Sequence, residues 1–260
     1  MISVFSTMKQ SIFYIKRYGV FATCKKIIGK INFSKRYKKW IINHEKIDKE
    51  QILHDIESFS YLPTFSICIP VYNVEEKWLR KCIQSIQKQW YTNWQLCMAD
   101  DCSTDENVRT VLKEYAQVDN RINIVYRYKN GHISEATNSA LQIATGEFIV
   151  LVDNDDELAL NALYEVAKIL QDHRDLDVIY SDEDKIDENG NRTNPYFKPD
   201  YCPDTLLSYN YISHMGVYRR TLIEQIGGFR KGVEGSQDYD LLLRVIELTE
   251  NIYHIPKILY

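Results

Sequence analysis

The sequence predicts an α/β fold with a mostly parallel β-sheet and helices on both of its faces. After Pro63, short apolar runs such as "FSICIPVY" alternate with longer amphipathic stretches. This alternation is typical of βαβ units, whose strands pair in parallel. The apolar fraction of 45% over 260 residues also suffices for a substantial core.

The elements of this region follow from their apolar patterns. Strands are predicted at 65–72, 94–99, 122–128, 147–152 and 177–181. Helices are predicted between them at 75–89, 106–117, 134–144 and 159–173. Beyond residue 182 the pattern loosens into acidic and Pro/Asn/Gly-rich sequence, and we expect short helices, a strand near 214–219, a helix at about 236–249 and a final strand at 252–260.

The charge distribution divides the chain into an arm and a body. Residues 1–44 contain ten Lys or Arg and no Asp or Glu, whereas the remainder contains 22 basic and 36 acidic residues. A basic arm joined to an acidic body indicates two surfaces with different partners. We therefore predict a basic helical N-terminal arm over 1–62 and an α/β body over 63–260.

The arm has the pattern of an amphipathic helix lying in a membrane interface. Phe5, Met8, Ile12 and Ile15 recur at three- and four-residue steps. Basic residues interrupt the apolar runs well before the ~18 residues that a spanning helix requires, and the same interruption argues against a signal peptide. We favour contact with an anionic membrane surface, which predicts a cytoplasmic protein peripheral on the inner face of the cell membrane. A helix packed on the body and a nucleic-acid-binding arm are the alternatives.

The six cysteines indicate reduced thiols. They form no CxxC pair and no metal-ligand spacing, and Cys68 and Cys97 lie inside apolar runs. A free thiol in such a run behaves as a small hydrophobic side chain. This usage is typical of a cytosolic protein.

Polar residues gather where three predicted strands end. "IPVYN" (69–73) follows the first strand, "ADDCSTD" (99–105) the second and "DNDDE" (153–157) the fourth. Ligands of open parallel sheets bind beyond the carboxyl ends of the strands. Three such ends on one edge predict a site.

The acids after the fourth strand suit a hard divalent cation. Asp153 and Asp155 can converge on one ion that keeps positions open for water and phosphate oxygens, and such an ion would neutralise charge on a departing diphosphate. The alternative is that one of residues 153–156 caps the following helix, but capping explains one carboxylate only. In "ADDCSTD" we predict Ser103 or Thr104 as a helix cap, with Asp100 and Asp101 left free for a ligand.

These motifs together resemble glycosyltransferase family 2, the inverting enzymes of GT-A fold, and in particular its bacterial surface-polysaccharide members. The resemblance covers roughly residues 64–260. It rests on "SICIPVYN", "ADDCSTD", "NGHISEATNSAL", "GEFIVLVDNDDEL", "VIYSDEDKID", "FKPDY", "IGGFRKGVEGSQDYDL" and "HIPKILY", in that order.

The resemblance implies a nucleotide-diphosphate sugar donor, with a UDP-sugar favoured, and bound Mn²⁺ or Mg²⁺. Pro70 and Tyr72 would line the nucleoside pocket, and Asp101 would hydrogen-bond the base. Asp153 and Asp155 would be the DxD pair that holds the ribose and the metal-bound diphosphate. The acceptor would be a glycan or lipid-linked glycan, and no nucleic acid is expected as a partner.

Asp238 matches the catalytic base of the family. It falls in the first turn of a predicted helix, where the helix dipole favours an ionised carboxylate, and inverting transfer needs one base to take the acceptor proton. An ordinary first-turn acid is the alternative. The family often has Glu where this chain has Gln237, and "LY" is commonly followed by His-Trp-Arg, so the end at Tyr260 suggests a truncated chain.

The acceptor side is less specific. His214 and the stretch 180–187 lie where the family places its acceptor, and Asp182 and Glu183 are candidates for bonds to sugar hydroxyls. A solvated acidic loop is an equal alternative for 180–187, and a non-catalytic role is favoured for His214.

Two other classes of function compete with the transferase. One is a nucleotide-sugar-binding module of the same fold without turnover. The other is a haloacid-dehalogenase-like phosphatase, which also carries DxD after a strand. Its motif normally opens the domain and has Thr or Val where this chain has Glu157. Dinucleotide oxidoreductases and P-loop enzymes are disfavoured because neither glycine motif is present.

Overall fold

The computed structural model describes the backbone of residues 2–260, together with their side chains apart from 2–11, 14, 27, 30 and 31. Two compact units make up the chain. One comprises residues 1–48 and 185–194, and the other comprises 49–184 and 195–260. The predicted boundary between arm and body was placed at 62/63, whereas the two units divide at 48/49.

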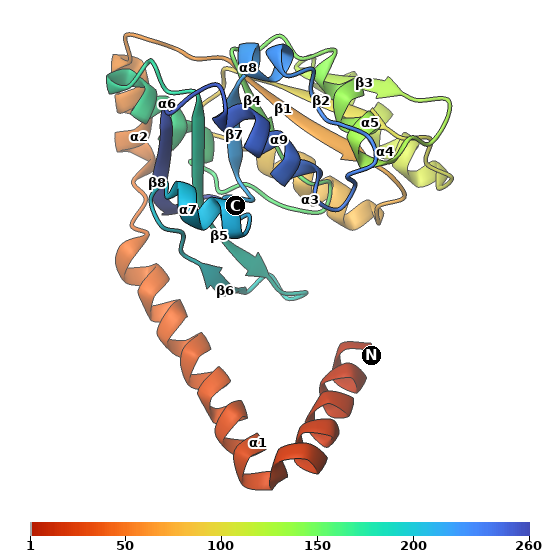
Figure 1. Cartoon of the computed structure of the whole chain (residues 1–260), viewed down its shortest axis with the longest axis vertical. Coiled ribbons are helices and arrows are strands. Elements are labelled where there is room, and N and C mark those ends of the chain that lie inside the picture. The colour runs from red at the N-terminus through yellow and green to blue at the C-terminus, as the bar shows by residue number, and fades with distance from the viewer. Residues whose placement is uncertain (1) are drawn as a thin grey trace. The chain divides into compact units, whose positions relative to one another are not determined.

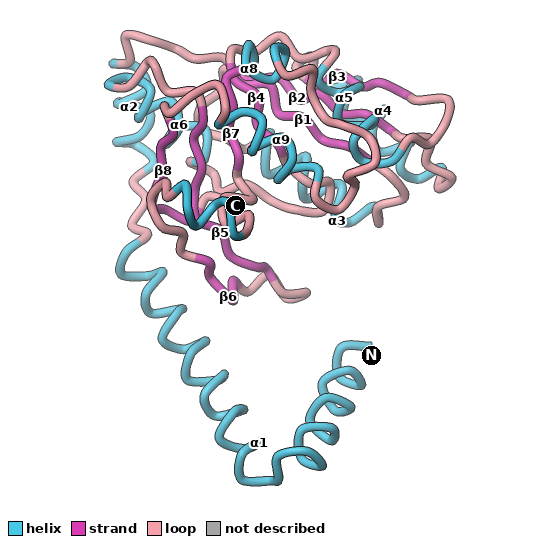
Figure 2. Tube along the Cα trace, viewed as in Figure 1, coloured by secondary structure: helices cyan, strands magenta, loops and turns pink. Residues whose placement is uncertain are grey.

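The smaller unit is built on one long helix. Helix α1 (Ile2–His44) is interrupted at Gly19, which has φ 83° and ψ 165°, and the tube in Figure 2 bends sharply within α1. Lys38 donates to the Asn191 side chain (3.0 Å), and Arg192 is ion-paired with Glu45. Phe5 and Met8, two of the predicted apolar residues, lie outside the described side chains, but Ile12 and Ile15 are exposed. No helix in the described part of the chain combines the length and apolarity needed to cross a membrane.

The larger unit is organised around the predicted sheet (Figure 1). The strands are β1 (Phe65–Val71), β2 (Trp94–Asp100), β3 (Ile122–Tyr126), β4 (Phe148–Leu151), β5 (Val178–Ile186), β6 (Arg192–Tyr196), β7 (Gly216–Arg219) and β8 (Ile252–Ile258). They run in the order β3-β2-β1-β4-β7-β5, with β8 also paired to β5. Strand β7 runs antiparallel to both β4 and β5, whereas the pairs β1–β2, β1–β4, β2–β3 and β5–β8 are parallel. The predicted α/β class with a mostly parallel sheet is confirmed.

Helices cover both faces of this sheet because its strands are apolar on both faces. The helices are α2 (Lys49–Ser58), α3 (Glu76–Gln87), α4 (Glu106–Val118), α5 (His132–Leu141), α6 (Ala162–Asp172), α7 (Pro203–Ser208), α8 (Arg220–Gln225) and α9 (Gln237–Ile246). Alternate residues of each strand face opposite sides. Ile67 of β1 belongs to the core that α3, α4 and α6 cover, whereas its neighbour Cys68 belongs to the core shared with α5 and α9.

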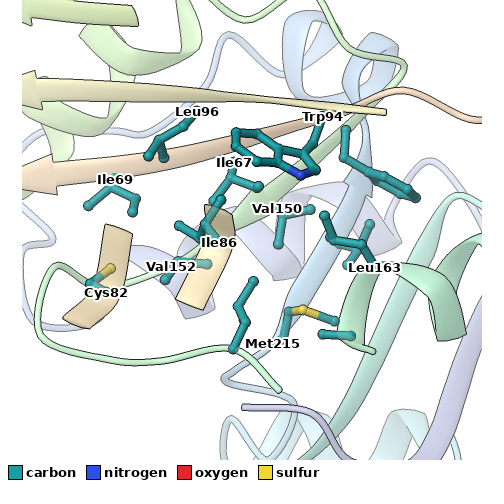
Figure 3. Close-up of a cluster of buried hydrophobic side chains, with 14 of the residues drawn as sticks. Ile67, Ile69, Cys82, Ile86, Trp94, Leu96, Val150, Val152, Leu163 and Met215 are labelled. Carbon is teal, nitrogen blue, oxygen red and sulfur yellow. The ribbon is translucent and has the colours of Figure 1, made fainter. Parts of the chain in front are cut away.

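The first of these cores lies beneath the strand ends that carry the site. Figure 3 shows Ile67 and Ile69 of β1 close to Ile86 of α3. Val150 of β4 and Val152, which follows β4, lie in the same cluster. All five side chains are at most 2% exposed. Close packing of this kind holds the carboxyl ends of β1 and β4 in a fixed relation.

Two details of the predicted elements are wrong. Helix α4 is capped by Asp105, whose carboxylate accepts from the Asn107 N–H at 2.9 Å, and not by Ser103 or Thr104. The Ser103 hydroxyl instead accepts from the Asn73 N–H (3.1 Å). Strand β5 also continues to Ile186, five residues beyond its predicted end; it pairs with β8 as far as Asp182 and also has β6 as a neighbour in the sheet.

Candidate functional site

A cavity of about 410 Å³ opens where the carboxyl ends of β1, β2 and β4 meet. The predicted residues Pro70, Tyr72, Asp101, Asp153 and Asp155 all line it. The other lining residues are Val71, Asn130, His132, Ile133, Ala136 and Asn154. Sequence motifs from three separate strand ends therefore converge on one concave surface.

The Asp101 end of the cavity is held by an arginine. Arg127 donates from Nε to Asp101 Oδ1 (2.7 Å) and from Nη1 to the Ser139 hydroxyl (2.6 Å). The Gly131 N–H donates to both Asp101 oxygens, at 3.0 and 3.1 Å. A Cβ at Gly131 would lie 2.0 Å from the Glu135 carboxylate and 2.5 Å from the Arg127 guanidinium, so a larger residue here would displace these two side-chain ends. Asp101 is thus fixed in place, with acceptor capacity remaining at Oδ2.

Asp100 is not free for a ligand, contrary to the prediction. Its side chain is fully buried, Oδ1 accepts from the Ser103 N–H (3.0 Å) and Oδ2 accepts from Arg109 Nε (2.9 Å). The last residue of a strand points to the opposite side from its successor. Asp100 therefore anchors the turn after β2, and only Asp101 reaches the cavity.

The acids after β4 are held by hydroxyl and main-chain groups. Tyr260 donates its hydroxyl proton to Asp156 Oδ2 (2.7 Å), and the Tyr260 hydroxyl oxygen accepts from the Asp153 N–H (3.1 Å). The Asn154 amide donates to the Pro70 carbonyl (2.9 Å). This turn is joined to β1 and to the end of the chain, which fixes the direction of the Asp153 side chain.

These acids lack a basic partner. Across the described side chains, no Lys or Arg is ion-paired with Asp153, Asp155 or Asp156; the His214 imidazole lies near them, with Nε2 3.7 Å from Asp153 Oδ2. Burial raises the pKa of Asp153, an effect that Asp155 increases and His214 opposes. The turn carries negative charge that a positive ligand would neutralise.

Asp238 comes close to this turn from another element. It lies in the first turn of α9, as predicted, and a smaller cavity is lined by Asp238, Asp153, His214 and Pro70 among others. Burial raises the pKa of Asp238. His214 acts to lower this pKa, and the Asp153 carboxylate acts to raise it. Gln237 donates to Asp238 Oδ2 at 3.2 Å. The two acidic motifs, 85 positions apart, therefore face one space.

The predicted acceptor-side acids have partners within the protein. Asp182 is buried in β5, where its Oδ1 accepts from the Lys198 N–H (2.8 Å) and lies 2.9 Å from His254 Nε2. Glu183 is ion-paired with Lys198 (2.9 Å). The interpretation of Asp182 as part of a solvated loop is wrong. The alternative prediction, that Asp182 bonds a sugar hydroxyl, is also wrong, because its carboxylate is buried and bonded within the protein.

Sequence reasoning missed Arg127 and Tyr260. Arg127 directly follows β3, the strand end that carries no conspicuous acidic motif, so inspection of every strand end would have found it. The contacts of Tyr260 with the turn at 153–156 span more than 100 residues and leave no local pattern.

The residues at the cavity fit a divalent cation shared with a phosphate ligand. The described residues contain no group of three or more His, Cys, Asp or Glu side chains able to hold a metal by themselves. Mg²⁺ and similar ions are commonly bound through one or two carboxylates, with substrate phosphates and water completing the shell. The hard carboxylate oxygens of Asp153 and Asp155, on a turn without basic partners, match that donor set.

Comparisons with known proteins agree with the sequence motifs. The sequence model of the family described as "Glycosyl transferase family 2" matches residues 66–227. An uncharacterized protein, y4gI, of Sinorhizobium fredii is 49% identical over 200 residues, which cover 76% of this chain and 22% of that protein. The O-antigen biosynthesis protein RfbC of Myxococcus xanthus is 35% identical over 224 residues, covering 86% of this chain and 18% of RfbC. This chain therefore spans about a fifth of the length of these relatives.

A solved structure has a similar fold. The crystal structure of S. aureus TarS 1-349 in complex with UDP-GlcNAc superposes with a TM-score of 0.63 and 25% sequence identity. The match covers 76% of this chain and 57% of the TarS chain.

Proposed function

The chain belongs to glycosyltransferase family 2, and on this premise we propose that it transfers a sugar from a nucleotide-diphosphate sugar, with inversion, to a glycan or lipid-linked glycan during surface-polysaccharide synthesis. The single observation that carries the proposal is the convergence of Asp101, Asp153 and Asp238 from three elements on adjoining cavities. The RfbC and TarS names support the substrate classes.

The donor would occupy the 410 Å³ cavity. Its base would lie against Pro70 and Tyr72, with an N–H donating to Asp101, which Arg127 and Gly131 hold in place. Uracil offers one such N–H, and TarS was crystallised with UDP-GlcNAc, so a UDP-sugar is favoured. Asp153 and Asp155 would hold the ribose and, through Mn²⁺ or Mg²⁺, the diphosphate.

Asp238 would act as the base. It takes the proton of the acceptor hydroxyl as that oxygen attacks the anomeric carbon and the bond to the nucleoside diphosphate breaks. A bound cation would offset the charge that develops on the leaving diphosphate. A raised pKa makes Asp238 a stronger base than an exposed carboxylate, while the first-turn position in α9 favours its ionised form.

The test is a transfer assay on the full chain. Nucleotide-diphosphate sugars are offered one at a time with Mn²⁺ or Mg²⁺ and a mixture of bacterial glycan acceptors, and released nucleoside diphosphate and extended glycan are measured. Turnover that requires acceptor and metal supports the transferase. Tight donor binding without any turnover would instead favour the alternative, a nucleotide-sugar-binding module; a DxD phosphatase would release inorganic phosphate.

We also propose that helix α1 holds the enzyme on the cytoplasmic face of an anionic membrane. Ile12, Phe13, Tyr18 and Phe21 are all at least 49% exposed, and residues 1–44 carry ten basic residues without an acid. Each basic residue near an anionic surface contributes about 1 kcal/mol, a term that salt screens. A lipid-linked acceptor cannot leave that surface, so attachment would bring the enzyme to it.

Liposome co-sedimentation tests this attachment. The full chain should bind vesicles that contain phosphatidylserine and should detach as salt rises, whereas the double variant Phe13→Asp/Phe21→Asp and a chain without residues 1–44 should bind weakly. Equal binding by all three, or binding to neutral vesicles as strong as to anionic ones, would show that α1 has another partner.

A further inference from the structure

Lys198, from the motif "FKPDY", is a buried cation that the proposed chemistry does not use. Its side chain is 0% exposed. The ammonium group donates to Glu183 Oε2 (2.9 Å), to the Ile212 carbonyl (2.6 Å) and to the His214 carbonyl. All three N–H donors of the ammonium are therefore used inside the protein.

The position of Lys198 is itself fixed from both sides. The buried Asp182 carboxylate accepts from the Lys198 N–H at 2.8 Å. Glu183, the next residue of β5, accepts from the Lys198 ammonium and also from the His214 N–H (3.3 Å). The motifs "YSDEDKID" and "FKPDY" thus form one clamp around the main chain of His214.

The clamped segment is held by side chains, among them those of the buried Ile212 and of Asn210, which accepts from the Ser213 N–H (3.1 Å). Residues 212–214 precede β7 and take no part in its pairing with β4 or β5. Ser213 has φ 42°, in the left-handed region that non-glycine residues seldom adopt. Side-chain contacts, rather than a sheet ladder, hold this segment where it lies.

The side chain that this segment presents faces the proposed reaction centre. The imidazole of His214 stacks on Tyr260 with a centroid distance of 4.8 Å and an angle of 13°. Its Nε2 lies 3.7 Å from Asp153 Oδ2, and His214 lines the smaller cavity together with Asp238. His214 therefore lines the same cavity as the acid assigned to the donor diphosphate and the acid assigned to the acceptor proton.

We propose that the buried Lys198–Glu183 pair positions His214, and that His214 contacts the sugar hydroxyls at the point of transfer. The proposal rests on the proposed function for the identity of the ligand, but the positioning depends only on the contacts above. An imidazole can both donate to and accept from hydroxyl groups. Lys198 and Glu183 are positioning residues, since neither reaches the cavities described above.

A double-mutant cycle in the transfer assay tests the role in catalysis. Lys198→Met should lower kcat on the order of 100-fold, the loss produced by a misplacement of about 1 Å, while the donor KM changes little. His214→Ala should lower kcat similarly, and Lys198→Met should add little in the His214→Ala background. Losses that multiply would overturn the proposal, since they would mean that Lys198 acts independently of His214.

Two further variants separate positioning from general stability. Removing the buried ammonium in Lys198→Met leaves three acceptors without a donor. Glu183→Gln is therefore the milder second variant, and it should also lower kcat. Lys257→Met is the matched control, because Lys257 is ion-paired with Glu165 (2.7 Å) away from both cavities. It should leave kcat unchanged. A loss of kcat in Lys257→Met equal to that in Glu183→Gln would overturn the proposal.

A spectroscopic measurement decides the positioning claim even when no donor is turned over. The imidazole signals of His214 are assigned in a histidine-labelled full chain by comparison with His214→Gln. Stacking on Tyr260 gives these signals a ring-current shift, which Lys198→Met and Glu183→Gln should reduce and Lys257→Met should not. Unchanged signals in the first two variants would refute the clamp, whereas absence of turnover in the wild type would refute only the proposed function.

Discussion

The acids at the end of β2 and the acids at the end of β4 are alike in sequence and opposite in environment. Asp100 and Asp101 are almost fully buried and ion-paired with Arg109 and Arg127. The acids at 153–156 contact a phenol, main-chain groups and one histidine, and within the described structure none is ion-paired with Lys or Arg.

This difference separates acids that support the fold, of which Asp101 also lines the cavity, from acids left free to bind a cation. A carboxylate whose charge is already neutralised contributes mainly to the native fold, and its loss leaves a buried donor without a partner. A group of carboxylates without basic partners is held together against its own repulsion and gains most from a cationic ligand. Removing a paired acid should therefore reduce stability, and removing an unpaired acid should reduce function.

The largest expected effect sharpens this comparison within one helix. Asp238 is unpaired with any basic residue in the described structure, whereas Asp240 is ion-paired with Arg244 at 2.8 Å. Asp238→Asn should lower the rate of transfer by roughly 10²–10⁴ while donor binding stays nearly intact, because only proton removal is lost. Asp240→Asn should retain transfer and lower the melting temperature. Near-normal transfer by Asp238→Asn, in the assay that reports donor turnover, would rule out Asp238 as the catalytic base.

The second effect concerns stability at the two strand ends. Asp101→Asn should lower the free energy of unfolding by about 1–3 kcal/mol, because Arg127 would lose its charged partner. Asp155→Asn, on an exposed side chain without a basic partner, should stay within about 0.5 kcal/mol of the wild type. Urea unfolding of the metal-free proteins measures both. The comparison fails if the two substitutions destabilise the fold equally.

The smallest effect is a pH dependence of stability at Asp182, a third acid that has a basic partner. His254 lies 2.9 Å from Asp182 and 3.0 Å from Asp200. Burial acts to lower the pKa of His254, but the two carboxylates outweigh it, so the pKa lies above its ordinary value. A raised pKa gives stability that is complete below about pH 6.5 and is lost as pH rises through the folded-state pKa.

The variant His254→Gln isolates this contribution. The unfolding free energy of the wild type should exceed that of the variant by more at weakly acidic pH than at alkaline pH. Urea unfolding at the two pH values gives the difference. A stability difference that is independent of pH would show that the imidazole is not charged in the folded state.

The fold was predictable where the pattern is local. Strands β1 to β4 were located to within two residues at each end because their apolar runs are bounded by polar residues. The convergence of residues 101, 153 and 155 on one cavity followed from the rule that parallel strands present ligands at their carboxyl ends.

What could not be predicted depends on contacts between distant residues. Asp100 and Asp101 are adjacent in sequence and each is ion-paired with an arginine, and only the packed structure shows that Asp101 lines the cavity whereas Asp100 does not. Asp182 looked like part of a solvated loop because its partners, Lys198 and His254, lie 16 and 72 positions away. Burial and pairing of single carboxylates are set by the packed structure and have no local signature.

The central claim is that the unpaired acids after β4 bind the metal-bound diphosphate of the donor. The most direct test is isothermal titration of the full chain with UDP, in Mn²⁺ or Mg²⁺ and again in excess chelator, for the wild type, Asp155→Asn and Asp238→Asn. We expect binding that requires the metal in the wild type and in Asp238→Asn, and that is strongly weakened in Asp155→Asn. Equal UDP affinity with and without metal, or undiminished metal-dependent binding by Asp155→Asn, would contradict this account of the site.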